Sequence, residues 1–103
     1  MNKYSKRVDA NHQDVIKTLR SIEGIIVEDT SDVGGGFPDL LIGYRKNGER
    51  RFALMEIKDG NKVKSAQKLT PAQVKWHEKW DGFPVCLVDG PDAARRHVAV
   101  LQS

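Results

Sequence analysis

The sequence predicts a small α/β domain in which helices and strands follow one another in the order α-β-β-β-α-β. Apolar residues at helical spacing indicate a first helix before residue 22, and a helix-capping motif at residues 70–73 indicates a second. Between these segments, two apolar runs flank an Asn-Gly pair, the strongest short-range signal for a β-hairpin. The chain has 103 residues, 39% of them hydrophobic, so we expect a single domain, residues 1–103, with a modest core.

The N-terminal part of the chain contains an arm, a helix and a strand. Residues 1–8 are polar and basic, and we expect them to form a flexible arm. Apolar side chains recur on one helical face over residues 15–22, which predicts an amphipathic helix that Asp9 or Asn11 can cap. The β-branched run 25–27 predicts the first strand.

Three consecutive glycines, residues 34–36, precede the hairpin. A P-loop is excluded because a strand follows the glycines, whereas a P-loop requires a helix there. Two interpretations remain, a turn that brings the chain to Pro38 or a close approach of the Gly35 and Gly36 backbone to a DNA phosphate. The turn is the favoured interpretation.

The hairpin places two carboxylates face to face. Segments 40–45 and 50–58 form its strands, and Asn47-Gly48 forms a two-residue turn that needs positive φ at both positions. In this register Asp39 stands opposite Glu56, with their Cβ atoms roughly 4.5–5.5 Å apart.

Two carboxylates at that separation repel each other, so a shared proton or a cation must lie between them. Oxygen ligands of this kind suit a divalent metal ion. Lys58 lies two residues after Glu56 and therefore on the same face, whereas Ile57 points toward a core. Because apolar residues occur at both alternations along the strands, we expect both faces of the sheet to be covered.

The C-terminal half begins with a basic loop, residues 59–68, which contains Lys62, Lys64 and Lys68. A helix should follow over residues 70–80, because Thr70 can cap it and Gln73 completes a capping box. We expect a last core strand at 83–88 and then a terminal helix or mixed segment.

Composition limits the function classes. The net charge is +3, from 17 basic and 14 acidic residues, which is a mild preference for polyanionic partners. The single cysteine, Cys86, lies in an apolar run and is expected to be a buried core thiol; it excludes an internal disulfide and a cysteine-based zinc site. The sequence contains no apolar run of membrane-spanning length and no signal-peptide core, so we expect a cytoplasmic protein with no membrane partner and no organic cofactor.

Two motifs resemble a known family. The segments Phe37-Pro38-Asp39-Leu40-Leu41-Ile42-Gly43 and Met55-Glu56-Ile57-Lys58 resemble the PD-(D/E)XK nuclease signature. With the glycines before them and Leu69-Thr70-Pro71-Ala72-Gln73 after them, they resemble the virus-type replication-repair nuclease (VRR-NUC) family in its short, stand-alone, phage-like form. The resemblance covers roughly residues 9 to 90.

The resemblance implies a restriction-endonuclease-like fold, with a mixed central sheet flanked by helices. It implies a site that binds Mg²⁺ or Mn²⁺ through Asp39, Glu56 and the backbone carbonyl of Ile57, with Lys58 and Gln73 as further catalytic residues. Many relatives carry a metal-binding Glu in the first helix, where this chain has only polar or Asp residues. Candidate DNA contacts are Asn11, Gln13, Gly35, Gly36, Lys62, Lys64 and Lys68.

The predicted function is metal-dependent, structure-specific cleavage of DNA, in branched DNA such as Holliday junctions, by a homodimer from a prokaryotic host or a phage. The alternative is a nuclease-fold module that binds branched DNA or a repair partner without cutting. A restriction-type enzyme is less favoured because the chain has little room for base-reading elements.

Several of these residues also have structural interpretations. The capping box alone can explain Gln73, and a helix cap can explain Asn11. Surface or cap roles are favoured for His12 and His77, and Trp76 and Trp80 at helical spacing suit a core or an interface better than base stacking.

Overall fold

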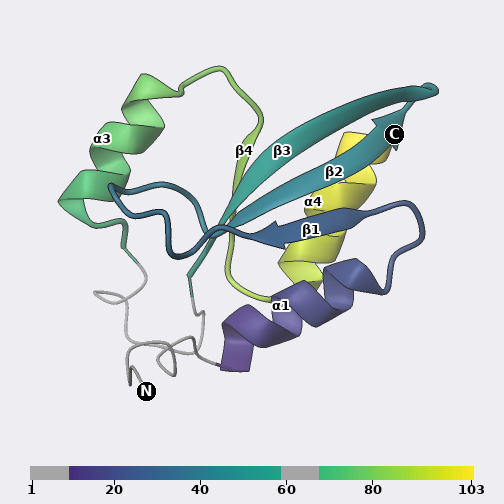
Figure 1. Cartoon of the computed structure of the whole chain (residues 1–103), viewed down its shortest axis with the longest axis horizontal. Coiled ribbons are helices and arrows are strands. Elements are labelled where there is room, and N and C mark those ends of the chain that lie inside the picture. The colour runs from purple at the N-terminus through teal and green to yellow at the C-terminus, as the bar shows by residue number, and fades with distance from the viewer. Residues whose placement is uncertain (1–9, 59–67) are drawn as a thin grey trace.

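The structure is a computed structural model that describes residues 10–58 and 68–103. The arm predicted at residues 1–8, together with Lys62 and Lys64, lies outside these residues. The elements, shown in Figure 1, are α1 (Ala10–Arg20), β1 (Ile26–Asp29), β2 (Leu40–Lys46), β3 (Glu49–Ile57), α3 (Pro71–Lys79), β4 (Val85–Val88) and α4 (Pro91–Gln102).

The strands in the described part of the chain form a four-stranded sheet in the order β1-β2-β3-β4. β1 pairs with β2 and β2 with β3 in antiparallel fashion, whereas β3 and β4 are parallel. The predicted α/β class and mixed sheet are therefore confirmed. The segment after β4, which the sequence left as a helix or a mixed segment, is the helix α4, which begins with Pro91 at its first position.

The predicted hairpin register is confirmed. Lys46 pairs with Glu49, and the ladder continues to Leu40 opposite Met55. Asn47 and Gly48 have φ values of 54° and 81°, as a type I′ turn requires. A tight turn of this kind tolerates no slip in pairing, and the alternating pattern of side chains then fixes which residues share a face.

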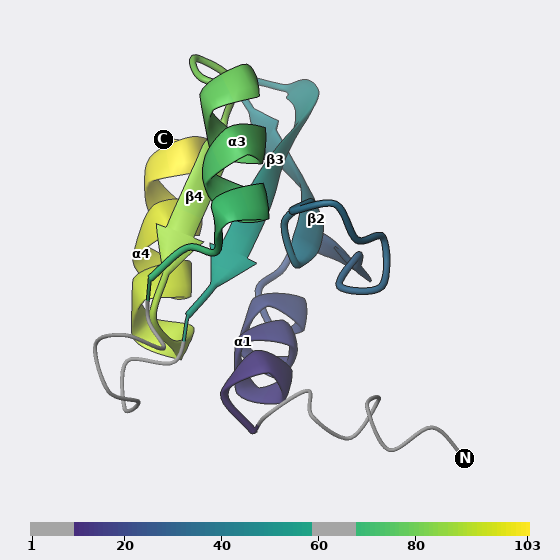
Figure 2. The same ribbon diagram turned by 90° about the vertical axis from the view of Figure 1, so that its left-hand side faces the viewer.

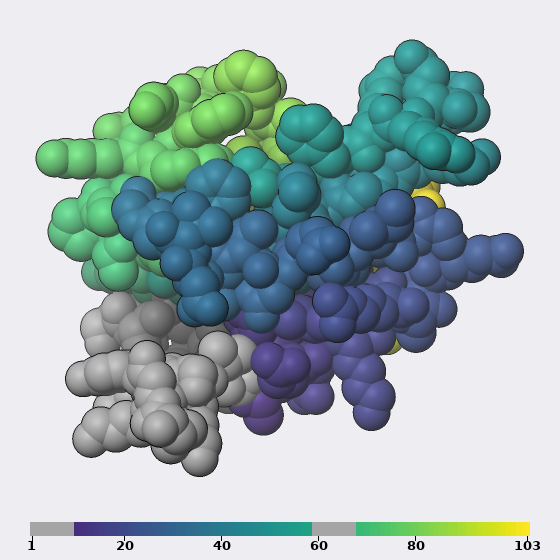
Figure 3. All heavy atoms as spheres, in the orientation of Figure 1, coloured from purple at the N-terminus to yellow at the C-terminus, as the bar shows by residue number. Residues whose placement is uncertain are grey.

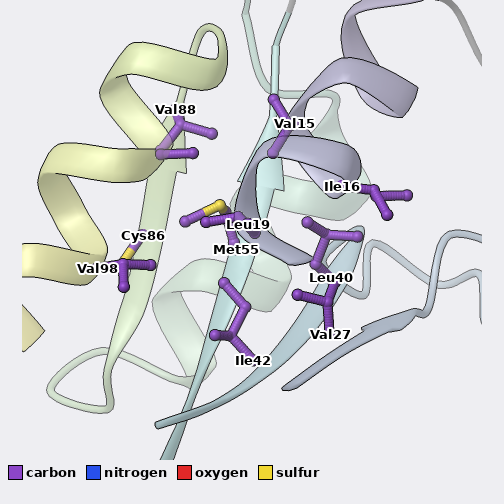
Figure 4. Packing of buried hydrophobic residues seen from close by; sticks show 11 residues of the cluster. Val15, Ile16, Leu19, Val27, Leu40, Ile42, Met55, Cys86, Val88 and Val98 are labelled. Carbon is purple, nitrogen blue, oxygen red and sulfur yellow. The ribbon is translucent and has the colours of Figure 1, made fainter. Parts of the chain in front are cut away.

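The core lies between the sheet and the pair α1 and α4. Figure 4 shows the apolar side chains of these elements meeting one another. The buried cluster consists of Val15, Ile16, Leu19, Val27, Leu40, Ile42, Met55, Cys86, Val88, Ala94 and Val98. Cys86 is a core thiol, as predicted, and burial raises its pKa. We call this side of the sheet the helix face.

The opposite side, which we call the open face, carries Ile26, Phe52 and Leu87, with exposed fractions of 67%, 62% and 49%. The prediction that helices cover both faces is therefore wrong for this part of the sheet. The helix α3 lies beside the end where β2 begins, apart from α1 and α4 in Figure 1. None of its side chains is buried.

No helix in residues 10–58 or 68–103 combines the length and the apolar character that crossing a membrane would require.

Candidate functional site

The candidate site lies at the end of the sheet where β2 begins and β3 ends. Asp39 directly precedes β2, and its Oδ2 atom accepts a hydrogen bond of 2.8 Å from the backbone N–H of Ile57. Thr30 fixes this entry to the strand with two bonds: its N–H donates to the Asp39 carbonyl (2.7 Å) and its hydroxyl to the Pro38 carbonyl (2.8 Å). The Asp39 side chain is therefore held against β3 before any ligand binds.

Glu56 lies one position beyond the last paired residues of the hairpin and is only 1% exposed. Its Oε2 atom accepts a hydrogen bond of 3.1 Å from Gln73 Nε2, whereas Oε1 is buried with no hydrogen-bond partner. Burial raises the pKa of Glu56 to about 8, and hydrogen bonding to Asp39 and its charge add to this effect, against the opposing charge of Lys58. The two carboxylates thus interact as the register predicted.

Gln73 connects the site to α3 through every polar atom of its side chain. Its Oε1 atom accepts from Lys58 Nζ and from the Thr70 N–H, both at 2.8 Å, while its Nε2 atom donates to Glu56. Thr70 Oγ1 in turn accepts from the Gln73 N–H, which completes the predicted capping box. The two interpretations of Gln73 therefore coexist, since one amide both caps α3 and contacts two predicted catalytic side chains.

Lys58 is fixed at two points. Its backbone N–H donates to the Val88 carbonyl at 2.8 Å, which extends the pairing of β3 with β4, and its ammonium group donates to Gln73. An ammonium group has three donors, so the bond to Gln73 leaves others available to an anionic ligand.

Aromatic packing positions α3 relative to the loop that precedes β2. The rings of Phe37 and Trp76 meet edge to face with centroids 5.5 Å apart, and Trp76 stacks on Trp80 at 5.3 Å with an interplanar angle of 13°. Phe83 continues this row of rings. The tryptophans lie outside the buried core cluster, so the core role is wrong for them, and an interface role stays a prediction. Figures 1 and 2 both show this loop reaching α3.

The glycine loop is a turn, as favoured above, in which all three glycines have positive φ. The Phe37 N–H donates to the Gly34 carbonyl at 3.1 Å. A Cβ atom on Gly36 would collide with the backbone of Ala72, whereas a Cβ on Gly35 would meet nothing within 4 Å. Gly36 is therefore needed for close contact between the loop and the first turn of α3, and a phosphate contact by Gly35 or Gly36 stays a prediction.

The first helix contributes differently from the sequence interpretation. Asn11 lies within α1 and does not cap it; its Nδ2 atom donates to the Asp89 carbonyl at 3.2 Å, which ties α1 to the turn after β4. His12 is buried, with Nε2 3.3 Å from Asp29 Oδ2, so the favoured surface or cap role is wrong for this residue. Gln13 and Lys68 are exposed, and their predicted DNA contacts stay predictions.

Two residues near Lys58 were missed or given a different role. Arg96 of α4 lines a shallow hollow beside Lys58, together with Leu87, Val88, Asp89 and Ala93. A firm helix assignment for residues 91–102 would have indicated its position next to this strand end. The Nε2 atom of His77 is buried without a hydrogen-bond partner, and burial, followed by the charge of Lys58, lowers the pKa of the imidazole.

The donor set fits a hard divalent cation. Asp39 and Glu56 supply carboxylate oxygens, and the carbonyl of Ile57 is a further oxygen donor on the same strand end. No group of three or more His, Cys, Asp or Glu side chains converges within the described residues, so such an ion would need the backbone carbonyl and water as well. The buried Oε1 atom of Glu56 supports the fit, because a buried carboxylate oxygen is costly without a partner.

Comparisons of this chain with protein-family models, with curated proteins and with solved structures find no match.

Proposed function

We propose that this protein is a divalent-metal-dependent endonuclease that hydrolyses phosphodiester bonds in DNA, with a restriction-endonuclease-like arrangement of its strands and helices. One observation carries the proposal. The buried carboxylate of Glu56 has a partnerless oxygen, lies against Asp39, and is joined through one amide to the ammonium group of Lys58. Burying a carboxylate is costly, and a bound cation would compensate for that cost when the group is ionised.

The carboxylates of Asp39 and Glu56 and the Ile57 carbonyl would hold Mg²⁺ or Mn²⁺, which when bound acts as a Lewis acid on the phosphate and lowers the pKa of water. Glu56 must be ionised to serve as a ligand. Its raised pKa means that ion binding competes with a proton below about pH 8. Activity should therefore increase as the pH rises toward 8.

The other side chains orient and stabilise the reacting phosphate. Lys58 has free N–H donors beside the carboxylates, and these can stabilise negative charge that develops on a phosphate oxygen during hydrolysis. Gln73 keeps the ammonium group and the Glu56 carboxylate at fixed positions, which saves the entropy of ordering them in each turnover. Arg96, beside Lys58, offers a second positive charge to the DNA backbone.

We further propose that the substrate is branched DNA and that two copies act together, because paired cuts in a junction need two sites and residues 10–58 and 68–103 contain one such carboxylate pair. The small core supports this proposal, and so does the open face, since large apolar side chains are exposed there.

The test is cleavage of a labelled four-way junction, a flap and a linear duplex with Mg²⁺, Mn²⁺ or EDTA. Glu56→Gln and Asp39→Asn preserve side-chain size and should abolish cutting while junction binding remains. Glu78→Gln, which removes an exposed carboxylate from α3, is the matched control and should cut normally. Junction binding without cutting under any metal would refute the enzyme and favour a non-cleaving module.

A further inference from the structure

A pair of arginines stands directly opposed near the tip of the β2–β3 hairpin. Arg45 of β2 pairs with Arg50 of β3, and both side chains are exposed. Strand alternation places them on the open face, the same face that carries Asp39 and Glu56 at the other end of the sheet. Figure 3 shows the hairpin projecting from the rest of the molecule, where a large ligand can reach it.

The charges of this pair are not neutralised by the described part of the chain. The neighbouring Arg51 pairs with Glu49 at 3.0 Å, but the described ion pairs include neither Arg45 nor Arg50. By register, Glu28 is a carboxylate of the open face, and it stands opposite Leu41, four residues along β2 from Arg45. Like charges directly opposed across two strands destabilise a hairpin, so this arrangement favours an anionic ligand.

The surroundings of the pair suit a phosphate group. Arg45 and Arg50 line a hollow together with Ile26 and Gly43. The hollow is deeper at Gly43 because glycine has no side chain there. The I′ turn at Asn47-Gly48 joins the strands with the fewest possible residues and limits their relative motion. Two arginines at paired positions can each donate two parallel hydrogen bonds from a planar guanidinium group to phosphate oxygens.

The distance from the arginine pair to the Asp39–Glu56 site allows one DNA duplex to contact both. Arg45 lies six residues after Asp39, and Arg50 lies six residues before Glu56, which corresponds to about 20 Å along a strand. Base pairs advance about 3.4 Å along the axis of B-DNA, so about six base pairs of a duplex span this distance. Between the two ends the open face presents apolar side chains and Gly43, with no charge from β2 or β3.

We propose that Arg45 and Arg50 form a second phosphate-binding site that holds the DNA backbone about six base pairs from the phosphate at the Asp39–Glu56 site. This inference rests on the proposed function, because it assigns both ends of one face to a single DNA arm. It predicts that Arg45 and Arg50 raise the affinity for junction DNA only when the arm is long enough to reach the hairpin.

The experiment measures junction affinity in EDTA, so that binding is separated from cutting. Junctions with arms of about 4 and about 12 base pairs, which fall on either side of the predicted span, are compared across a series of salt concentrations. The variants are the wild type, Arg45→Ala with Arg50→Ala, and a control, Lys17→Ala with Arg95→Ala, which removes two exposed charges from α1 and α4. Thermal unfolding checks that every variant is folded.

For the long arms, we expect the hairpin variant to bind about tenfold more weakly and the slope of log K against log salt to fall by roughly 1–2. For the short arms, the hairpin variant should match the wild type, and the control should match it for both. The inference would be overturned if the hairpin variant lost the same affinity on long and short arms, or if the control variant lost as much affinity as the hairpin variant. It would also be overturned if the arginine substitutions changed the oligomeric state and left DNA affinity unchanged. If the effect of the arginines on affinity depends on arm length but no metal ion supports cutting, the second phosphate site is retained and the proposed nuclease activity is refuted.

Discussion

Replacing Glu56 with Gln should make the apo protein more stable above neutral pH, although it removes a residue of the candidate site. The Glu56 carboxyl has an ordinary pKa of 4.5 and a folded-state pKa of about 8, chiefly because the side chain is buried. Below pH 4.5 the group holds its proton in both the folded and the unfolded protein and contributes nothing to pH dependence. Between pH 4.5 and 8 only the unfolded protein releases the proton, so the free energy of unfolding falls as the pH rises.

The size of this loss follows from the two pKa values. Each pH unit between them costs about 1.4 kcal/mol, so the whole interval sets a ceiling of about 5 kcal/mol. Because Glu56 also interacts with the neighbouring Asp39, we expect a net loss of about 2–5 kcal/mol. Small domains have about 5–15 kcal/mol of total stability, so a loss of this size is easily measured.

Urea unfolding followed by circular dichroism at pH values from 5 to 8.5, in EDTA, gives the free energy of unfolding directly. The difference between Glu56→Gln and the wild type should grow steadily with pH in favour of the variant. Glu23→Gln, which removes an exposed carboxylate, controls for the loss of one negative charge. Its free energy of unfolding should change with pH in the same way as that of the wild type. The three histidines are common to all three proteins, so their contributions cancel in the differences.

Parallel curves for the wild type and Glu56→Gln would refute the reasoning. That result would mean that Glu56 is already ionised in the folded apo protein and that burial beside Asp39 does not retain its proton.

Three further predictions concern the loop, the linking amide and the metal. Gly36→Ala should lower the free energy of unfolding in urea by about 1–3 kcal/mol more than Gly35→Ala. Both glycines have positive φ, but only a Cβ atom at position 36 collides with Ala72. Equal losses of stability in the two variants would contradict this packing. Gln73→Ala should lower kcat by about 10–100-fold with junction affinity kept, whereas an unchanged rate in single-turnover assays would exclude a positioning role. Saturating Mn²⁺ at pH 8 should raise the melting temperature of the wild type by roughly 5–10 °C, and a shift of the same size in Asp39→Ala would disprove binding at this site.

Local sequence signals predicted the parts of the site that depend on neighbouring residues. The Asn47-Gly48 turn fixed the register of the hairpin, and the register placed Asp39 beside Glu56. The capping box at Thr70 and Gln73 was predicted for the same reason, because all its atoms come from one helical turn. In both cases a few φ angles and a short loop leave only one arrangement of low energy.

Contacts between distant segments could not be predicted in this way. Nothing local to Gln73 indicates that its amide reaches Glu56, 17 residues earlier, or that Asn11 bonds to Asp89, 78 residues later. His12 was misassigned because burial depends on which helix packs on which strand, and its own neighbours in sequence do not reveal this. The same limit applied to the coverage of the sheet, where apolar residues on both alternations predicted two covered faces.

The sequence by itself determined the α/β class, the hairpin register and the pairing of two carboxylates, because turn geometry and strand alternation act over a few residues. Only the tertiary structure decided that α3 contacts the Glu56 carboxylate through Gln73, that Gly36 packs on Ala72, and that the large apolar side chains of the open face stay exposed. These features depend on how the helices pack against the sheet after the long loops have closed. That packing is determined by side chains from the whole domain, so it cannot be deduced from a few neighbouring residues.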